Sequence, residues 1–200
     1  AGQVSITTKA KAPNLVTTSA CASATHALGY AFSDIKLGRV KACITGGVES
    51  TITAMGVSGF NALKALSTQN EDPQTASRPF DMNRGGFVIG EGAGFLMLEE
   101  LEHAKARGAK IYAEMIGYGA SGDAFHITAP EDSGSGMALA MSSALRDAEC
   151  NVTDVDFINA HGTSTKLNDK TETKALKLVF GEHAYKMPIT ANKSMIGHLL

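Results

Sequence analysis

Three short segments of the chain place reactive side chains among small or polar residues, each directly after a run that favours a β-strand. The segments are Thr18–Ser23, Asn159–Thr165 and Asn192–His198. Cys21, in the first, offers a thiolate nucleophile, while His161 and His198 can move protons or donate hydrogen bonds near neutral pH. Ligands of open α/β sheets bind at the carboxyl ends of strands. We therefore expect the three segments to converge on one pocket.

Cys21 lies where a predicted strand passes into a predicted helix. A helix N-terminus lowers the pKa of a thiol, and its backbone N–H groups can stabilise an oxyanion. Position alone fits a buried structural cysteine among small residues equally well. Cys43 lies inside a predicted strand and Cys150 in a loop, so we expect both to be structural. With three cysteines, at least one stays outside any internal disulfide.

The remaining histidines and glycines carry less information. We expect His26, His103 and His183 to face solvent. The position of His126 in the sequence does not distinguish a functional role from a solvent-facing one. No pair of cysteines or histidines has the spacing of a zinc site. The Gly90–Gly94 cluster lacks the last glycine of a dinucleotide-binding loop and precedes an apolar strand, which favours close strand packing instead.

The elements that must position these side chains alternate between strand and helix patterns. Apolar residues three and four apart predict a helix over 24–35, ended by Gly38. A short charged helix, acidic first and basic last, is predicted over 99–107, with Gly108 after it. Further helices are predicted over 137–148 and 169–180. Asp169 and Glu172 resemble a capping box at the start of the last helix. Predicted strands cover 15–18, 40–45 (closed by Gly46 and Gly47), 87–98 (buried, with a bend), 111–118, 155–159 and 187–191, and 69–81 is a predicted loop. This alternation predicts an α/β fold with largely parallel sheets covered by helices.

Composition narrows the class of protein. The 200 residues, 44% of them hydrophobic, suffice for about one compact domain. Eighteen basic against twenty acidic residues argue against a strongly basic nucleic-acid or membrane-surface protein, and no apolar stretch is long enough to span a membrane. Few cysteines favour a reduced, cytoplasmic compartment, or an organelle if the source is eukaryotic. Because the chain starts without Met and stops inside a predicted element, we interpret it as a piece of a longer protein.

Taken together, the motifs resemble those of the β-ketoacyl-[acyl-carrier-protein] synthases, the condensing enzymes of fatty-acid synthesis. Ser19–Ser23 resembles the nucleophile motif of that family, and Arg78–Gly94 its glycine-rich signature. Asn159–Thr165 and Asn192–His198 match its two histidine motifs, in the same order. The resemblance is strongest to the elongating type II enzymes that use Cys-His-His. Two departures are Gly85, where relatives often have Asp, and Ala12, where Gly is more usual.

The resemblance implies a thiolase-like α/β fold of two related halves in five layers (α/β/α/β/α), commonly assembled as a homodimer. Residues 1–200 would then be a partial ketosynthase domain, truncated at both ends. Approximately residues 1–100 would form the end of the N-terminal half, and 101–200 the start of the C-terminal half.

It also implies a decarboxylative condensation of malonyl-acyl-carrier protein with an acyl chain held on Cys21. No cofactor is implied beyond the phosphopantetheine of the acyl carrier protein, which would be the partner together with malonyl and acyl thioesters. No metal is implied in catalysis, although Asn159 is a candidate for holding a structural monovalent ion. The implied roles are catalytic for Cys21, His161, His198 and Lys193; substrate-binding for Thr163, Thr165, Phe87 and Thr128; and supporting for Glu172, which would pair with Lys193, and for Asp169.

Five alternatives remain. A starter synthase would have Asn in place of His198, and a degradative thiolase would carry a second catalytic cysteine. A ketosynthase of a polyketide pathway shares the motifs, although modular ones commonly differ around His161. A non-catalytic chain-length factor would lack Cys21. A cysteine protease would explain a cysteine and one histidine but not a second histidine with Lys193.

Overall fold

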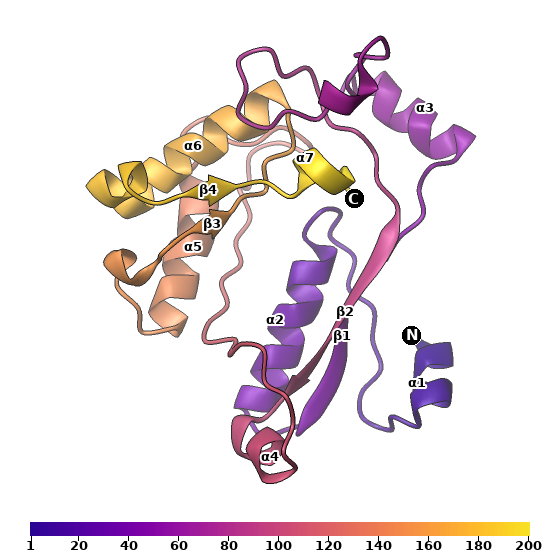
Figure 1. The fold of residues 1–200 in the computed structure, drawn as a ribbon, viewed down its shortest axis with the longest axis vertical. Coiled ribbons are helices and arrows are strands. Elements are labelled where there is room, and N and C mark those ends of the chain that lie inside the picture. The colour runs from indigo at the N-terminus through magenta and orange to yellow at the C-terminus, as the bar shows by residue number, and fades with distance from the viewer. The chain divides into compact units, whose positions relative to one another are not determined.

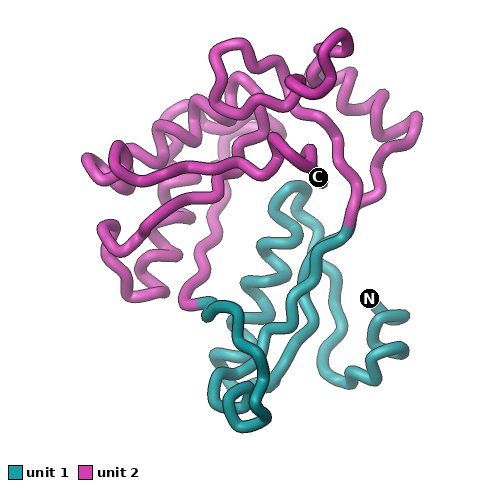
Figure 2. Tube along the Cα trace, viewed as in Figure 1, with its two compact units in different colours: residues 1–48, 93–115 teal, residues 49–92, 116–200 magenta.

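A computed structural model describes residues 1–200, which divide into two compact units that alternate along the chain (Figure 2). Unit 1 comprises residues 1–48 and 93–115, and unit 2 comprises residues 49–92 and 116–200. Each unit is built around its own two-stranded sheet, β1–β2 in unit 1 and β3–β4 in unit 2 (Figure 1). No helix of the chain combines the length and the apolar character needed to cross a membrane.

Unit 1 contains three helices beside its sheet. Its elements are α1 (Gly2–Thr8), α2 (Ser23–Lys36), β1 (Ala42–Glu49), β2 (Gly92–Glu99) and α4 (Leu101–Ala106). The predicted helix over 24–35 is confirmed as α2, and Gly38 follows it with a φ of 70° that favours glycine. The short charged helix is confirmed as α4. Both carboxylate oxygens of Glu100 cap it by accepting from the backbone N–H groups of Glu102 and His103.

The strand predicted over 40–45 does not end at Gly46 and Gly47, because β1 continues through both to Glu49. A Cβ at Gly46 would lie only 2.0 Å from the backbone oxygen of Gly94 on β2. The missing side chain lets the two strands approach each other closely. Gly46 therefore permits the pairing of β1 with β2 rather than ending the strand.

Two predicted strands, 15–18 and 111–118, are wrong. Neither segment pairs its backbone with a neighbour, and an apolar β-rich run becomes a strand only where a second backbone supplies donors and acceptors. The expectation that 87–98 is buried is also wrong for part of its length. In β2 the side chains of Phe95, Leu96 and Met97 are each more than half exposed.

Unit 2 contains most of the helices and the larger apolar core. Its elements are α3 (Ala54–Ala62), η1 (Pro73–Thr75), α5 (Ser135–Asp147), η2 (Val152–Asp154), β3 (Ile158–Asn159), α6 (Lys166–Phe180), η3 (Gly181–Tyr185), β4 (Ile189–Thr190) and α7 (Lys193–Ile196). α5 packs against α6, and Leu176, Phe180 and Met187 form the buried centre of the core. β3 and β4 are parallel, with Ile158 opposite Ile189, which agrees with the prediction of parallel strands for this sheet.

Helices of unit 2 differ from prediction mainly at their ends. The helix predicted over 169–180 begins at Lys166, and its N-cap is Thr165, whose hydroxyl accepts from the backbone N–H of Asn168. The predicted capping box is therefore wrong, since Asp169 lies one turn inside the helix and is buried. α3 was not predicted from the sequence, because Gly56 and Gly59 weaken its helix pattern.

Candidate active site

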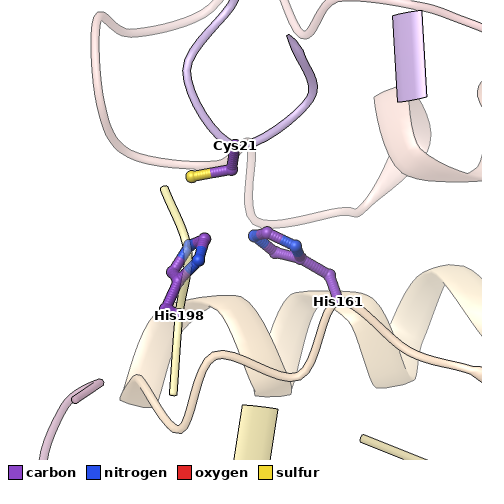
Figure 3. Close-up of side chains that lie close together, drawn as sticks. All are labelled: Cys21, His161 and His198. Carbon is purple, nitrogen blue, oxygen red and sulfur yellow. The ribbon is translucent and has the colours of Figure 1, made fainter. Parts of the chain in front are cut away.

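His161 and His198 come together in unit 2, from segments 37 positions apart (161 to 198). His161 follows β3, and His198 follows α7. Their ring centroids are 5.4 Å apart and the ring planes are nearly perpendicular, at 87° (Figure 3). The structure thus pairs the two imidazoles that sequence analysis singled out.

The backbone on both sides of His198 is fixed by a short segment of unit 2. The N–H of His198 donates to the Val88 carbonyl at 2.7 Å, and its own carbonyl accepts from the Gly90 N–H at 2.8 Å. Its ring packs edge-on against Phe87, with centroids 5.1 Å apart. Only 3% of His198 is exposed. Phe87, a predicted substrate-binding residue, thus contacts one of the predicted catalytic histidines.

Burial determines the protonation state of both histidines. Burial, and then the positive charge of Lys193, lower the pKa of His161 to about 4. Burial, and then His161 and Lys193, lower the pKa of His198 to about 3. Both rings are therefore neutral near pH 7. A neutral imidazole carries one N–H donor, which can stabilise a developing oxyanion.

Glu172 fixes the turn that follows β3. Its carboxylate accepts from the backbone N–H groups of His161 at 2.7 Å and Gly162 at 2.9 Å, and from the Asn168 side chain at 3.3 Å. Gly162 is needed there, because its φ is 46° and a Cβ would lie 2.6 Å from the Cβ of Ala191. The predicted pairing of Glu172 with Lys193 stays a prediction.

The predicted substrate-binding threonines occupy different environments. Thr163 is buried, and its hydroxyl lies 2.9 Å from the hydroxyl of Thr165 at the start of α6. Thr128 is exposed in a separate loop, where its backbone N–H bonds to the ring of His126. Asn159, the candidate ion ligand, is exposed and accepts from the Asn192 N–H at 3.4 Å. Thr163 and Thr165 therefore lie together on the His161 loop, and Thr128 belongs to another loop.

Cys21 belongs to unit 1, immediately before the N-cap of α2, Ala22. The preceding residue, Ala20, has a φ of 48°, an uncommon value for a residue with a side chain. The Ser23 hydroxyl holds this turn by accepting from the Ser19 N–H and donating to the Ala20 carbonyl, each at 2.8 Å. Cys21 is exposed. Its convergence with the histidines stays a prediction.

The other cysteines and histidines differ in part from expectation. Burial, and then Asp34, raise the pKa of Cys43, which makes its thiolate less available. His103 is exposed as predicted. The solvent-facing positions expected for two others are wrong. The ring of His26 is only partly exposed and lies 2.7 Å from the Ser19 hydroxyl, and the partly buried ring of His183 lies 2.9 Å from the Val155 carbonyl.

Arg84 and Ser77, two polar residues near the His161 loop and Lys193, had no role predicted from the sequence. Arg84 bonds to the carbonyls of Thr165 and Lys166, and the Ser77 hydroxyl donates to the carbonyl of Lys193. These contacts join positions more than 80 residues apart, so no local spacing reveals them. The one signal in the sequence was that Arg84 falls inside the glycine-rich signature.

Sequence comparison matches both parts of the chain to one family. The family model described as "Beta-ketoacyl synthase, N-terminal domain" covers residues 1–104, and the one described as "Beta-ketoacyl synthase, C-terminal domain" covers residues 112–200. Proteins named 3-oxoacyl-[acyl-carrier-protein] synthase 2 from Vibrio harveyi and Staphylococcus aureus are 51% and 53% identical over the whole chain. The chain spans about half the length of these relatives, 48% and 49% respectively.

Solved structures agree over the same span. One is a type II PKS acyl-carrier protein in complex with its ketosynthase bound to the hexaketide. It has a TM-score of 0.97 and 41% identity, and the match covers 100% of this chain and 49% of that one. A β-ketoacyl synthase from Burkholderia phymatum STM815 has a TM-score of 0.92 and 44% identity, covering 99% of this chain and 47% of that one. These likenesses confirm the predicted thiolase-like α/β fold. The chain belongs to the β-ketoacyl synthase family.

Proposed function

We propose that the protein to which this chain belongs is a 3-oxoacyl-[acyl-carrier-protein] synthase of fatty-acid biosynthesis, an acyltransferase that lengthens an acyl chain by two carbons. The observation that carries the proposal is the pair of neutral, closely spaced imidazoles of His161 and His198. Decarboxylation of a malonyl thioester develops negative charge on the thioester oxygen, and two neutral donors suit that charge. The names of the curated relatives support the same reaction.

In the first half-reaction, the Cys21 thiolate attacks the carbonyl carbon of an acyl chain carried on acyl carrier protein. The carrier sulfur leaves and takes up a proton, and the acyl group stays on Cys21 as a thioester. The backbone N–H of Cys21 is the proposed donor to the tetrahedral oxyanion. Its position immediately before the N-cap of α2 supports this assignment, because the N-terminal end of a helix carries partial positive charge that favours an anion.

In the second half-reaction, malonyl-acyl-carrier protein replaces the departed carrier. His161 and His198 donate hydrogen bonds to the thioester oxygen while the bond to the carboxylate breaks and carbon dioxide leaves. The resulting carbanion attacks the acyl carbon on Cys21, and the sulfur departs as thiolate. The product is a 3-oxoacyl thioester on the carrier.

The remaining residues take supporting parts in the proposal. Lys193 orients the histidines, together with Glu172 and Asp169. Thr163 and Thr165 bind the pantetheine arm, Phe87 and Thr128 contact substrate, and Asn159 is the candidate ligand for a structural monovalent ion. The hydroxyl groups of Thr163 and Thr165 are hydrogen-bonded to each other, which supports a shared role for these two threonines.

The proposed partner is acyl carrier protein, whose phosphopantetheine carries both substrates, with no further cofactor. A similar ketosynthase has been solved in complex with its acyl-carrier protein, which supports this partner. We also propose a homodimer. Within each protomer, residues 1 to about 100 would belong to the N-terminal half and 101–200 to the C-terminal half.

A ketosynthase of a polyketide pathway is the second candidate. It is favoured by the likeness to the type II PKS ketosynthase bound to a hexaketide. A non-catalytic ketosynthase-like partner is disfavoured, because Cys21 is present.

Incubating the purified full-length protein with acyl- and malonyl-acyl-carrier protein tests these options. We expect a 3-oxoacyl-carrier product two carbons longer, detected by mass spectrometry, and none from the Cys21→Ser variant. Repeated extension to a chain with several unreduced keto groups would establish the polyketide alternative. Absence of both products from the unmodified protein would overturn the proposed function.

A further inference from the structure

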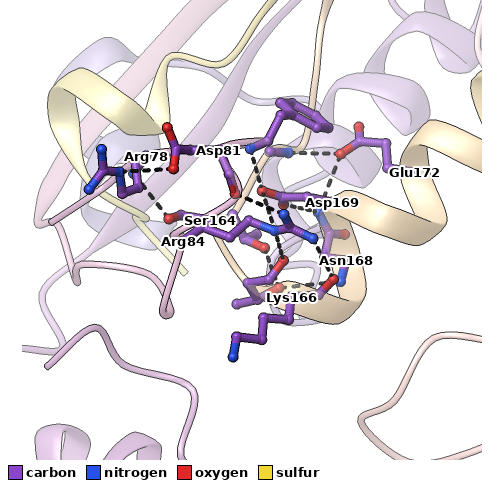
Figure 4. Close-up of polar contacts among 12 residues, drawn as sticks. Arg78, Asp81, Arg84, Ser164, Lys166, Asn168, Asp169 and Glu172 are labelled. Atoms are coloured by element: carbon purple, nitrogen blue, oxygen red, sulfur yellow. Dashed lines mark hydrogen bonds and ion pairs between the residues drawn. The ribbon is translucent and has the colours of Figure 1, made fainter. Parts of the chain in front are cut away.

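A single segment of unit 2, Arg78–Gly90, bonds to the surroundings of both histidines. We call it the strap. Its first part, up to Gly86, contacts the loop that follows His161 and the start of α6 (Figure 4). Its last part, from Phe87, contacts His198 through the ring and backbone contacts described above. The strap therefore connects the loop that follows His161 with the ring and backbone of His198.

Arg84 makes the densest set of contacts in the strap. Its Nε donates to the carbonyl of Thr165 at 3.0 Å, and one Nη donates to the carbonyl of Lys166 at 2.9 Å. The other Nη donates to the carbonyl of Asp81, within the strap itself, at 2.9 Å. The planar guanidinium can satisfy three such acceptors at once, which the single ammonium of a lysine cannot do in the same plane.

Asp169 anchors the same place from within α6. Its side chain is completely buried, and it accepts from the backbone N–H of Phe80 at 2.7 Å and from Asn168 at 3.1 Å. Arg84 supplies the positive charge, with its Nε 3.5 Å from the Asp169 carboxylate and only 16% of its side chain exposed. Losing the guanidinium would leave a buried carboxylate without its countercharge, which strongly favours rearrangement.

Ser164 provides the second attachment. It is fully buried, and its φ of 67° shows that the loop turns sharply at this residue. Its carbonyl accepts from the Gly86 N–H at 2.9 Å, and its hydroxyl accepts from the Arg78 N–H at 3.0 Å. The loop after His161 is thus held by the strap at Ser164, at Thr165 and at Lys166.

The distance along the strap from these attachments to His198 is short. Gly86 bonds to Ser164, and the next residue, Phe87, packs on the His198 ring. A displacement of the strap at Arg84 must therefore shift the His161 loop against His198. Misplacing a catalytic group by about 1 Å can cost about 10²-fold in rate.

We infer that Arg84 is a positioning residue, which sets the geometry between His161 and His198 by fastening the strap to the loop and to Asp169. This inference rests on the proposed function, because it assigns Arg84 to the decarboxylation step. It predicts that the two half-reactions respond differently to a change at Arg84. Acylation of Cys21 does not use the histidines, whereas decarboxylation does.

The test uses the Arg84→Gln and Arg84→Lys variants of the full-length protein. Acylation is measured by mass spectrometry with acyl-acyl-carrier protein, and decarboxylation by release of labelled carbon dioxide from malonyl-acyl-carrier protein. We expect Arg84→Gln to keep the acylation rate within about 2-fold of the unmodified protein and to lower the decarboxylation rate by about 10- to 100-fold. The decarboxylation rate of Arg84→Lys should lie between those of Arg84→Gln and the unmodified protein. Lys170→Ala is the matched control, since it removes an exposed cation of α6 that pairs with Asp132, and should leave both steps unchanged.

A second measurement needs no substrate. NMR pH titration of the imidazole resonances should show altered pKa values for His161 and His198 in Arg84→Gln but not in Lys170→Ala. If the unmodified protein is inactive, the proposed function is overturned. The titration would still decide whether Arg84 determines the geometry between His161 and His198. Equal loss of both half-reactions in Arg84→Lys, or unchanged decarboxylation and unchanged titration in Arg84→Gln, would overturn the inference.

Discussion

At the scale of the residue, the candidate site depends on two imidazoles that burial keeps neutral. His161 and His198 have pKa values of about 4 and about 3, well below the ordinary value of 6.5. The charge of Lys193 lowers both pKa values further. The charge of Lys193 and the burial of the rings thus act in the same direction, and they hold both rings in the neutral form, which has a single N–H donor.

This arrangement makes stability depend on pH in a defined direction. Because both pKa values are lowered on folding, the unfolded chain binds more protons below pH 6.5 than the folded one does. Stability is therefore fully present above about pH 6.5 and falls as pH decreases toward 4. Between pH 7 and pH 5 the loss is about 2 kcal/mol for each histidine.

Urea unfolding at the two pH values measures this loss. The double variant His161→Gln, His198→Gln removes both titrating groups and is the reference. We expect the free energy of unfolding of the unmodified full-length protein to fall more between pH 7 and pH 5 than that of the double variant. An equal loss would mean that the two rings are not buried in their neutral form.

The same residues make a kinetic prediction. His161→Ala and His198→Ala should each lower carbon dioxide release from malonyl-acyl-carrier protein by about 10² to 10³, because each removes a donor to developing charge. Acylation of Cys21 in the same variants is the internal control and should persist. Near-normal decarboxylation in both variants would exclude the histidines from that step.

At the scale of the element, local patterns predicted helices better than strands. The helix patterns over 24–35 and 137–148 correspond to α2 and α5, since helix periodicity and its end signals lie within one segment of sequence. The runs at 15–18 and 111–118 carry strand composition but form no strands, because pairing depends on a distant backbone. The cap of α6 was misplaced because Thr165 and Asp169 both suit a helix start, and only the structure shows which side chain accepts from a backbone N–H.

In the candidate site, too, the residues found from the sequence are those that lie in local motifs. Cys21, His161 and His198 were found from contiguous motifs in which a reactive side chain follows a β-rich run. The contacts of Arg84 with Thr165 and Lys166 could not be found in this way, because they span more than 80 positions. Sequence thus identified the reactive groups, and the structure identified what holds them.

Gly117 and Gly119, at the end of the predicted strand over 111–118 and just after it, pack closely against α5. A Cβ at Gly119 would lie 2.1 Å from the Ala140 carbonyl, inside the backbone of α5, whereas a Cβ at Gly122 would meet nothing within 4 Å. We expect Gly119→Ala to lower the free energy of unfolding by about 1–3 kcal/mol through overpacking. Gly122→Ala is the matched control and should stay within about 0.5 kcal/mol. Similar values for both variants, measured by urea unfolding, would show that segment 117–119 does not contact α5 closely.

At the scale of the whole molecule, the chain exposes more apolar surface than an independent domain should. Phe95, Leu96 and Met97 of β2 are 52%, 56% and 57% exposed, and Ile127 and Met82 are more than nine-tenths exposed. Contiguous exposed apolar surface in a monomer marks a contact or an aggregation liability. The chain spans about half the length of its curated relatives.

We therefore expect residues 1–200, produced alone, to bind a hydrophobic dye, to lack a cooperative thermal transition and to show no condensing activity. The full-length protein under the same conditions is the control. A sharp transition with full turnover by residues 1–200 would show that the exposed apolar side chains need no cover.

Cys21 is the residue on which the proposed acyl transfer depends, and peptide mapping of the acyl group tests it most directly. The full-length protein is incubated with acyl-acyl-carrier protein without malonyl substrate, digested, and analysed by mass spectrometry for the acyl mass increment. We expect the increment on the peptide that contains Cys21 and its loss in the Cys21→Ser variant. An acyl group on Cys43 or Cys150, with Cys21 unmodified, would contradict the account.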